Sequence, residues 1–78
     1  MFKIGDFARN IESGWLGRIE EILAPETVKV DETHSFQETM CRMVGVDTLV
    51  CIAGGLTWEQ AISEDDVQWH SLSDLKRP

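Results

Sequence analysis

The residue types that could carry out chemistry in this chain are thiols, imidazoles and carboxylates, and their spacing argues against a catalytic or metal centre. The zinc-binding types are Cys41, Cys51, His34 and His70. Structural zinc ligands normally come in close pairs, and the chain has no such pair. His70 and Ser71 are neighbours, and neighbours on a strand point to opposite faces, so they do not form a nucleophile and its base. We therefore predict no enzyme activity, no metal and no cofactor.

An acidic run with tryptophans on both sides is the candidate binding surface. Residues 64–66 are Glu-Asp-Asp, and Trp58 and Trp69 flank them. Tryptophan is a frequent anchor of protein interfaces, although a thin core would also bury it. The predicted binding residues are Trp58, Asp65, Asp66, Gln68, Trp69 and His70. The alternative role is core packing for the tryptophans and solubility for the acidic residues.

The composition narrows the kind of partner. The 78 residues include 14 acidic and 7 basic ones, for a net charge of −7. Since phosphate backbones are bound through Lys and Arg, direct nucleic-acid binding is disfavoured, whereas a basic protein partner is compatible. No apolar stretch approaches the roughly 20 residues of a membrane span. The start has no apolar secretory segment, so we expect a cytoplasmic protein with reduced thiols.

Alternating apolar runs and turn residues predict a chain built mainly from short strands. We expect strands at residues 2–9, 15–23, 27–31, 39–44, 48–53 and 67–70, the fourth and fifth forming a hairpin around Gly45. Residues 32–38 are expected to be a loop. Thr57 and Gln60 have the spacing of a helical capping box, and residues 71–75 predict a tight helical turn. The whole chain, 1–78, is expected to be one domain.

The expected strands also assign roles to single side chains. Cys41 and Cys51 would lie across the expected hairpin from each other and pack as small apolar groups. Trp15, at the start of a strand, is expected in the core. His70 is expected to be an exposed strand residue.

Two segments resemble the ends of an SH3-like barrel. At the N-terminal end these are Gly5-Asp6 and Arg9, followed by Trp15, Gly17 and Ile19; at the C-terminal end they are Val67-Gln68, Leu75 and Arg77. Such domains occur in bacteria and phages, and these residues are similar to those of the plasmid-borne type II dihydrofolate reductases. The resemblance covers about 30 residues. It implies an all-β (mainly β) fold, a small SH3-like barrel of five to six strands with one short helical turn.

The reductase family's pore strand is not retained. Trp69 and His70 stand where the family has Ile and Tyr, Asp66 stands for a serine, and Asn10 stands for the lysine that attracts the anionic ligands. A pore for an anionic cofactor needs positive charge. The resemblance therefore predicts the fold without the reductase activity.

Three hypotheses for function follow. The first is a binding module, from a bacterium or a mobile element, whose partner is a protein or a second copy of itself. The second is a homo-oligomeric barrel with a small-molecule pore around Gln68, Trp69 and His70. The third is an acidic inhibitor that blocks a host nucleic-acid enzyme by imitating phosphates.

Overall fold

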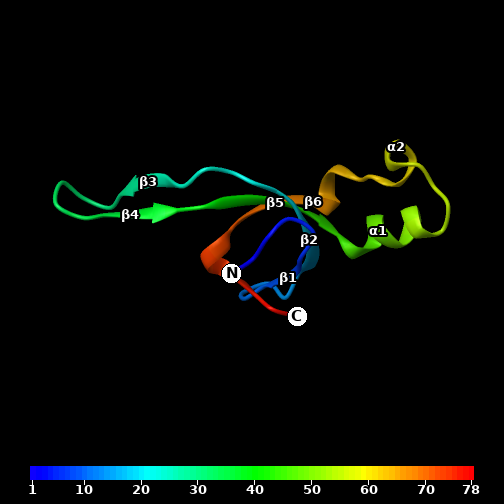
Figure 1. Ribbon diagram of the computed structural model, residues 1–78, viewed down its shortest axis with the longest axis horizontal. Coiled ribbons are helices and arrows are strands. Elements are labelled where there is room, and N and C mark those ends of the chain that lie inside the picture. The colour runs from blue at the N-terminus through cyan, green and yellow to red at the C-terminus, as the bar shows by residue number, and fades with distance from the viewer.

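This chain folds into seven antiparallel strands in two sheets, with helical turns between some of them, as a computed structural model of residues 1–78 shows (Figure 1). The larger sheet has the strand order β6-β5-β2-β1-β7. Its members are β1 Phe7–Asn10, β2 Leu16–Ile22, β5 Met40–Gly45, β6 Val67–Ser71 and β7 Leu75–Lys76. The smaller sheet pairs β3, Glu26–Lys29, with β4, Ser35–Glu38. The prediction of a mainly β chain is confirmed, with one strand more than expected.

The five-stranded sheet is rolled, because its two edge strands are joined by very little chain. Only the 3-10 turn η2, Leu72–Asp74, lies between β6 and β7. Four residue steps through such a turn span about 8–11 Å. In a flat sheet of five strands the two edges would be about 19 Å apart. The sheet must therefore curl, as a small barrel requires.

The core lies on the inner side of this curl and is small. Its fully buried members are Ala8, Ile19, Cys41 and Met43, and Leu75 closes it from the last strand. Ile19 faces Met43 across the β2–β5 pair, so alternation along both strands keeps these side chains on one face. Each strand thus has an inner face and an outer face. The burial of Cys41 agrees with its expected packing role.

A two-stranded arm, residues 23–39, leaves the sheet between β2 and β5 (Figure 1). The prediction of a loop at 32–38 is wrong for residues 35–38, which form β4. This strand pairs with β3 in the register Thr27–Gln37 and Val28–Phe36. Both strands of the arm are largely exposed. Their sequence therefore needs no regular alternation of apolar and polar residues, and the pattern that usually indicates a strand is absent.

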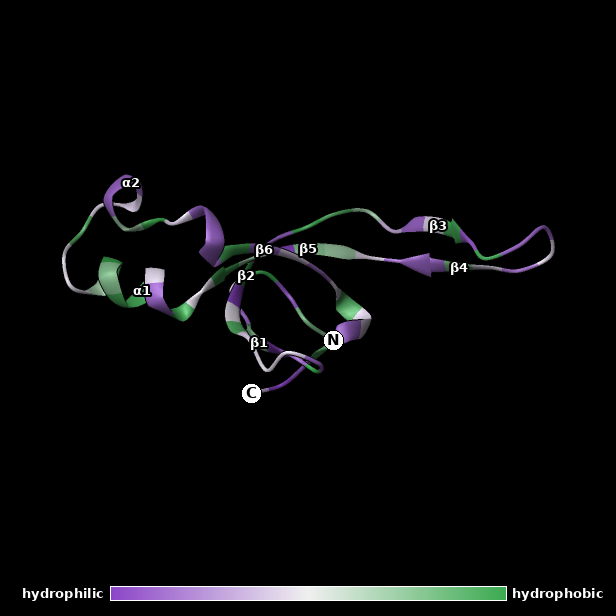
Figure 2. Ribbon diagram, turned by 180° about the vertical axis from the view of Figure 1, so that it is seen from behind, coloured by the Kyte–Doolittle hydropathy of each residue, from purple (hydrophilic) through white to green (hydrophobic).

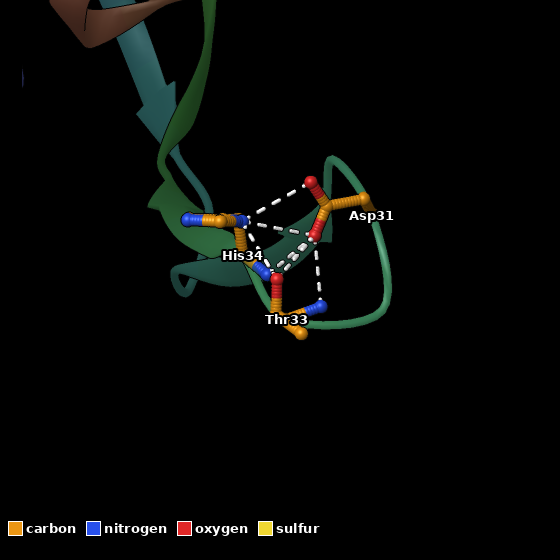
Figure 3. A network of polar contacts seen from close by, with 3 residues as sticks. All are labelled: Asp31, Thr33 and His34. Carbon is orange, nitrogen blue, oxygen red and sulfur yellow. Dashed lines mark hydrogen bonds and ion pairs between the residues drawn. The ribbon is translucent and has the colours of Figure 1, made fainter.

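Three residues fix the tip of the arm (Figure 3). The Asp31 carboxylate accepts hydrogen bonds from the backbone amides of Thr33 and His34, both at 2.8 Å. The Thr33 hydroxyl and the His34 ring also contact it, at 3.0 Å each. These bonds, led by that from the Thr33 amide, hold the pKa of Asp31 below its ordinary value of 3.8. The turn is thus held by one ionised side chain.

A helical insertion, residues 46–66, connects β5 to β6. It contains α1 Val46–Ala53, α2 Trp58–Ala61 and the 3-10 turn η1 Glu64–Asp66. The expected strand at 48–53 is wrong, since those residues form the helix α1 and the expected hairpin does not exist. Cys51 is consequently exposed instead of packed against Cys41. The prediction of one short helical turn is also wrong, because the chain has the helices α1 and α2 and two 3-10 turns.

Two local predictions in and after the insertion are confirmed. The Thr57 hydroxyl accepts from the Gln60 amide at 3.3 Å, and the Gln60 side chain accepts from the Thr57 amide at 3.0 Å, which completes the capping box. The tight turn expected at 71–75 is η2. The arm and the insertion point to opposite ends of the molecule, which measures 52 × 23 × 20 Å (Figure 1).

Candidate protein-interaction surface

The net charge is unevenly divided along the molecule. The helical insertion carries five carboxylates and no Lys or Arg, and the arm carries four carboxylates and one lysine. The remaining residues, which form the rolled sheet, carry five carboxylates and six basic side chains. All of the net negative charge therefore lies in the arm and the helical insertion, which we call the two extensions. Within the insertion, α2 is mainly hydrophilic (Figure 2).

The insertion encloses a cleft of about 350 Å³ between α1 and the segment that runs from α2 to η1. Its walls are Asp47, Thr48, Cys51, Ala61, Ser63, Asp65 and Asp66. Asp47 and Asp65 are exposed and make no ion pair. The same insertion exposes three large apolar side chains, Val50, Leu56 and Trp58. The insertion therefore has unpaired negative charge in its cleft and exposed apolar side chains outside the cleft walls.

Asp66 has a structural task inside this cleft. Helix α1 begins after Gly45, which has no side chain to cap it. The Asp66 carboxylate takes that place by accepting a hydrogen bond from the Thr48 amide at 2.9 Å. The three atoms nearest to a Cβ built on Gly45 all belong to the Asp66 carboxyl group, so only glycine fits there. Asp66 thus ties η1 to the start of α1 and shapes the cleft between them.

Gln68 and His70 lie on the inner face of β6 and bond to each other. His70 Nε2 is 3.0 Å from Gln68 Oε1, and His70 Nδ1 is 3.0 Å from Asn10 Nδ2. The His70 ring also stacks on Trp15, with centroids 5.2 Å apart. The expectation of an exposed His70 is wrong, because this network leaves it half-buried. Asn10 and Trp15 were missed as its partners because 60 and 55 residues separate them from His70 in the sequence.

The network assigns the proton on His70. Asn10 Oδ1 accepts from the amides of Glu12 and Ser13, both at 2.9 Å, so the Asn10 amide nitrogen is the atom that faces His70. Since that nitrogen donates, His70 Nδ1 must accept, and the proton lies on Nε2, toward Gln68. A doubly protonated ring would set two donors against each other. Burial lowers the pKa of His70 below 6.5, with a smaller opposing effect of Asp74.

Trp69 lies on the other side of the sheet from Gln68 and His70. It is 48% exposed and pairs across the strands with Arg42, whose Nε is 3.6 Å from Glu21. A pore lined by one face of this sheet would therefore contain Gln68 and His70, or Trp69, but not all three. The six predicted binding residues therefore do not form one surface. Asp65 and Asp66 line the cleft, Trp58 is exposed on α2, Gln68 and His70 lie on the inner face, and Trp69 lies on the outer face.

The thiols differ in their surroundings. Burial raises the pKa of Cys41, whose Sγ donates to the His70 carbonyl at 3.5 Å, whereas Cys51 is exposed in the cleft wall. Nowhere do three or more His, Cys, Asp or Glu side chains gather as metal ligands would. No helix has the length and apolar character needed to cross a membrane.

Comparison with protein-family models, with curated proteins and with solved structures finds no match to this chain. The resemblance of its two ends to SH3-like barrels and type II dihydrofolate reductases therefore stays a prediction. Its function has to be inferred from the charges, cleft and exposed side chains of the molecule itself.

Proposed function

We propose that this chain is a non-enzymatic binding module that presents its helical insertion to a basic segment of a partner protein. The observation that carries the proposal is the composition of the insertion, which has five carboxylates and no basic residue around a cleft of about 350 Å³. A cytoplasmic protein from a bacterium or a mobile element would suit this function.

The chemistry of the cleft favours an arginine or lysine side chain as the group bound. Asp47 and Asp65 stand on opposite walls, on α1 and η1, and neither is neutralised by a neighbouring cation. A guanidinium can bridge two carboxylates because it has five donors in a plane. The cleft volume is at the lower end of the roughly 300–1,000 Å³ found for ligand sites, which suits a side chain better than a large cofactor.

The apolar residues of the insertion would supply the rest of the contact. Trp58 is 38% exposed on α2, and Val50 is 68% exposed on α1. Charged contacts steer a partner and set its register, whereas large apolar anchors contribute most of the affinity. We therefore expect a partner segment in which basic residues alternate with aliphatic ones.

Fluorescence anisotropy with a labelled arginine–leucine peptide tests this proposal. The double variant Asp47→Asn/Asp65→Asn should weaken binding at least about tenfold, which corresponds to 1.4 kcal/mol. A control variant, Glu12→Gln/Glu32→Gln, removes the same charge outside the insertion and should retain nearly full affinity. Asp66 is left intact because it caps α1. Equal affinity of wild type and the Asp47/Asp65 variant would overturn the proposal.

The same charge distribution favours a second candidate, an acidic inhibitor of a nucleic-acid enzyme. Five carboxylates within 21 residues could occupy a groove that normally holds phosphates. DNA should then compete with this chain for its partner, and added salt should weaken the complex. A partner that binds DNA and this chain at the same time would exclude this candidate.

A further inference from the structure

The arm, residues 23–39, has an apolar face that nothing in this chain covers. The register places Val28 opposite Phe36, and Val30 follows on the same face. Phe36 is 50% exposed and Val30 is 68% exposed. A two-stranded hairpin standing alone in water is marginally stable. The arm therefore gains stability from any surface that covers this face.

Two carboxylates at the base of the arm lie on that same face. Glu26, two residues before Val28, is directly opposite Glu38, which is two residues after Phe36. Like charges directly opposite each other in a sheet are destabilising. Neither glutamate has a cation within ion-pair distance. The covering surface should therefore combine apolar side chains with at least two cations.

The outer face of the rolled sheet has that combination. Cross-strand pairing places Phe7 beside Arg18, and Arg42 beside Trp69, on one face. Phe7 is 44% exposed and Trp69 is 48% exposed. We call the set of Phe7, Arg18, Arg42 and Trp69 the outer patch.

The two arginines of the outer patch keep donors available. Arg18 uses its Nε to bind Glu20 at 2.6 Å, and the closest approach of Arg42 to Glu21, at 3.6 Å, is also through Nε. Their terminal nitrogens make no hydrogen bond within the chain. A guanidinium held through Nε can still bind a second carboxylate with its terminal nitrogens.

We propose that the arm of one copy of this chain lies on the outer patch of a second copy, and that a two-fold axis makes the contact reciprocal. Val28, Val30 and Phe36 would cover Phe7 and Trp69, while Glu26 and Glu38 bind the two arginines. Packing one arm against another, or against a helical insertion, would bring like charges together, because both extensions are negative. The rolled sheet, which holds six of the seven basic residues, is the part of a second copy with complementary charge.

Light scattering on a sizing column tests whether the chain forms a dimer and whether opposite charges on the arm and the outer patch hold it together. The wild type should form a dimer. Glu26→Arg/Glu38→Arg should become monomeric because its arm now repels the arginines of the patch. Arg18→Glu/Arg42→Glu should become monomeric for the opposite reason. An equimolar mixture of the two variants should dimerise again, because both contacts of the mixed dimer join opposite charges.

Two substitutions that leave the charge unchanged keep the test valid if a charge reversal impairs folding. Phe36→Ser removes the largest apolar side chain of the arm face and should weaken dimerisation at least about tenfold. Gln37→Ser alters the opposite face of the same strand and should leave the dimer intact. A monomeric wild type, a dimer insensitive to Phe36→Ser, or folded charge variants that do not recombine would each overturn the proposal.

Discussion

The contact between Gly45 and Asp66 makes the sharpest prediction about stability, because a single carboxylate both caps α1 and fills the space beside the glycine. Asp66→Ala removes the hydrogen bond to the Thr48 amide. Gly45→Ala places a methyl group where that carboxyl group lies, so Asp66 must move away and loses the same bond. The two substitutions therefore break one interaction from its two sides.

The expected cost follows from the nature of that bond. A lost helix cap costs about 1–2 kcal/mol, and a hydrogen bond to a charged group contributes about 1.5–3 kcal/mol. Since the Thr48 residue is 2% exposed, water cannot fully replace the lost acceptor. We expect Asp66→Ala to lower the free energy of unfolding by about 2 kcal/mol, or the Tm by about 10 °C in a chain of this size. Asp66→Asn, which keeps an acceptor oxygen, should lose about half as much.

Combining the substitutions gives the decisive result. Gly45 has φ −69° and ψ 159°, which alanine adopts without strain. In wild type Gly45→Ala should cost about 2 kcal/mol, but in the Asp66→Ala background the methyl group has room. There it should be neutral or stabilising by about 0.5 kcal/mol, because alanine restricts the unfolded chain.

Urea denaturation of wild type, both single variants and the double variant measures this cycle. A coupling free energy near 2 kcal/mol is expected, within the usual range of about 0.5–3 kcal/mol for residues in contact. Strictly additive losses would show that Gly45 and Asp66 do not meet as described. Circular dichroism of each variant without urea serves as the control for a folded starting state.

Three further results are expected. In the native protein Cys51 should react with a thiol reagent quickly and Cys41 only on unfolding, because burial raises the Cys41 pKa and hides its sulfur; mass spectrometry after brief alkylation would contradict this if both sites were modified alike. Because the pKa of His70 in the folded state lies below the ordinary 6.5, the free energy of unfolding should be highest above that pH and fall as the pH drops below it. If this reasoning is wrong, the urea midpoints of wild type and His70→Gln will depend on pH in the same way. The depressed pKa of Asp31 contributes stability above about pH 3.8 that is lost on further acidification, so the amides at the tip of the arm should exchange faster in acid than the intrinsic rates require, and an Asp31→Asn variant should lack this change.

The two proposed contacts use different parts of the molecule, so each can be tested and can fail separately. The helical insertion would bind a basic protein segment, whereas the arm and the outer patch would join two copies of the chain. Asp47 and Asp65 belong to the first surface alone, and Glu26 and Glu38 to the second. A dimer that does not bind the basic peptide would support the arm contact and reject the role of the insertion, and a monomer that binds it would do the reverse.

The amino-acid sequence was enough to predict the local elements whose signals need no distant partner. The capping box of Thr57 and Gln60 acts over three residues, and the turn η2 follows from a short polar segment between apolar residues. The β2 strand was predictable from its length and from the turn residues on both sides of it, although its two faces are imperfectly sorted. The surplus of acidic residues was visible directly, although its location was not.

The features that depend on contacts between distant residues became visible only in the folded chain. Residues 48–53 alternate Thr, Val and Ile like a strand, but Asp66, 18 residues beyond Thr48, caps them as a helix. The sequence predicts an exposed His70 on a strand, but the curl of the sheet brings Asn10 against its ring. β4 exists because backbone pairing with β3 does not depend on an apolar face. In each case a hydrogen bond across the fold outweighed a weak local preference, and such bonds leave no periodic signal in the sequence.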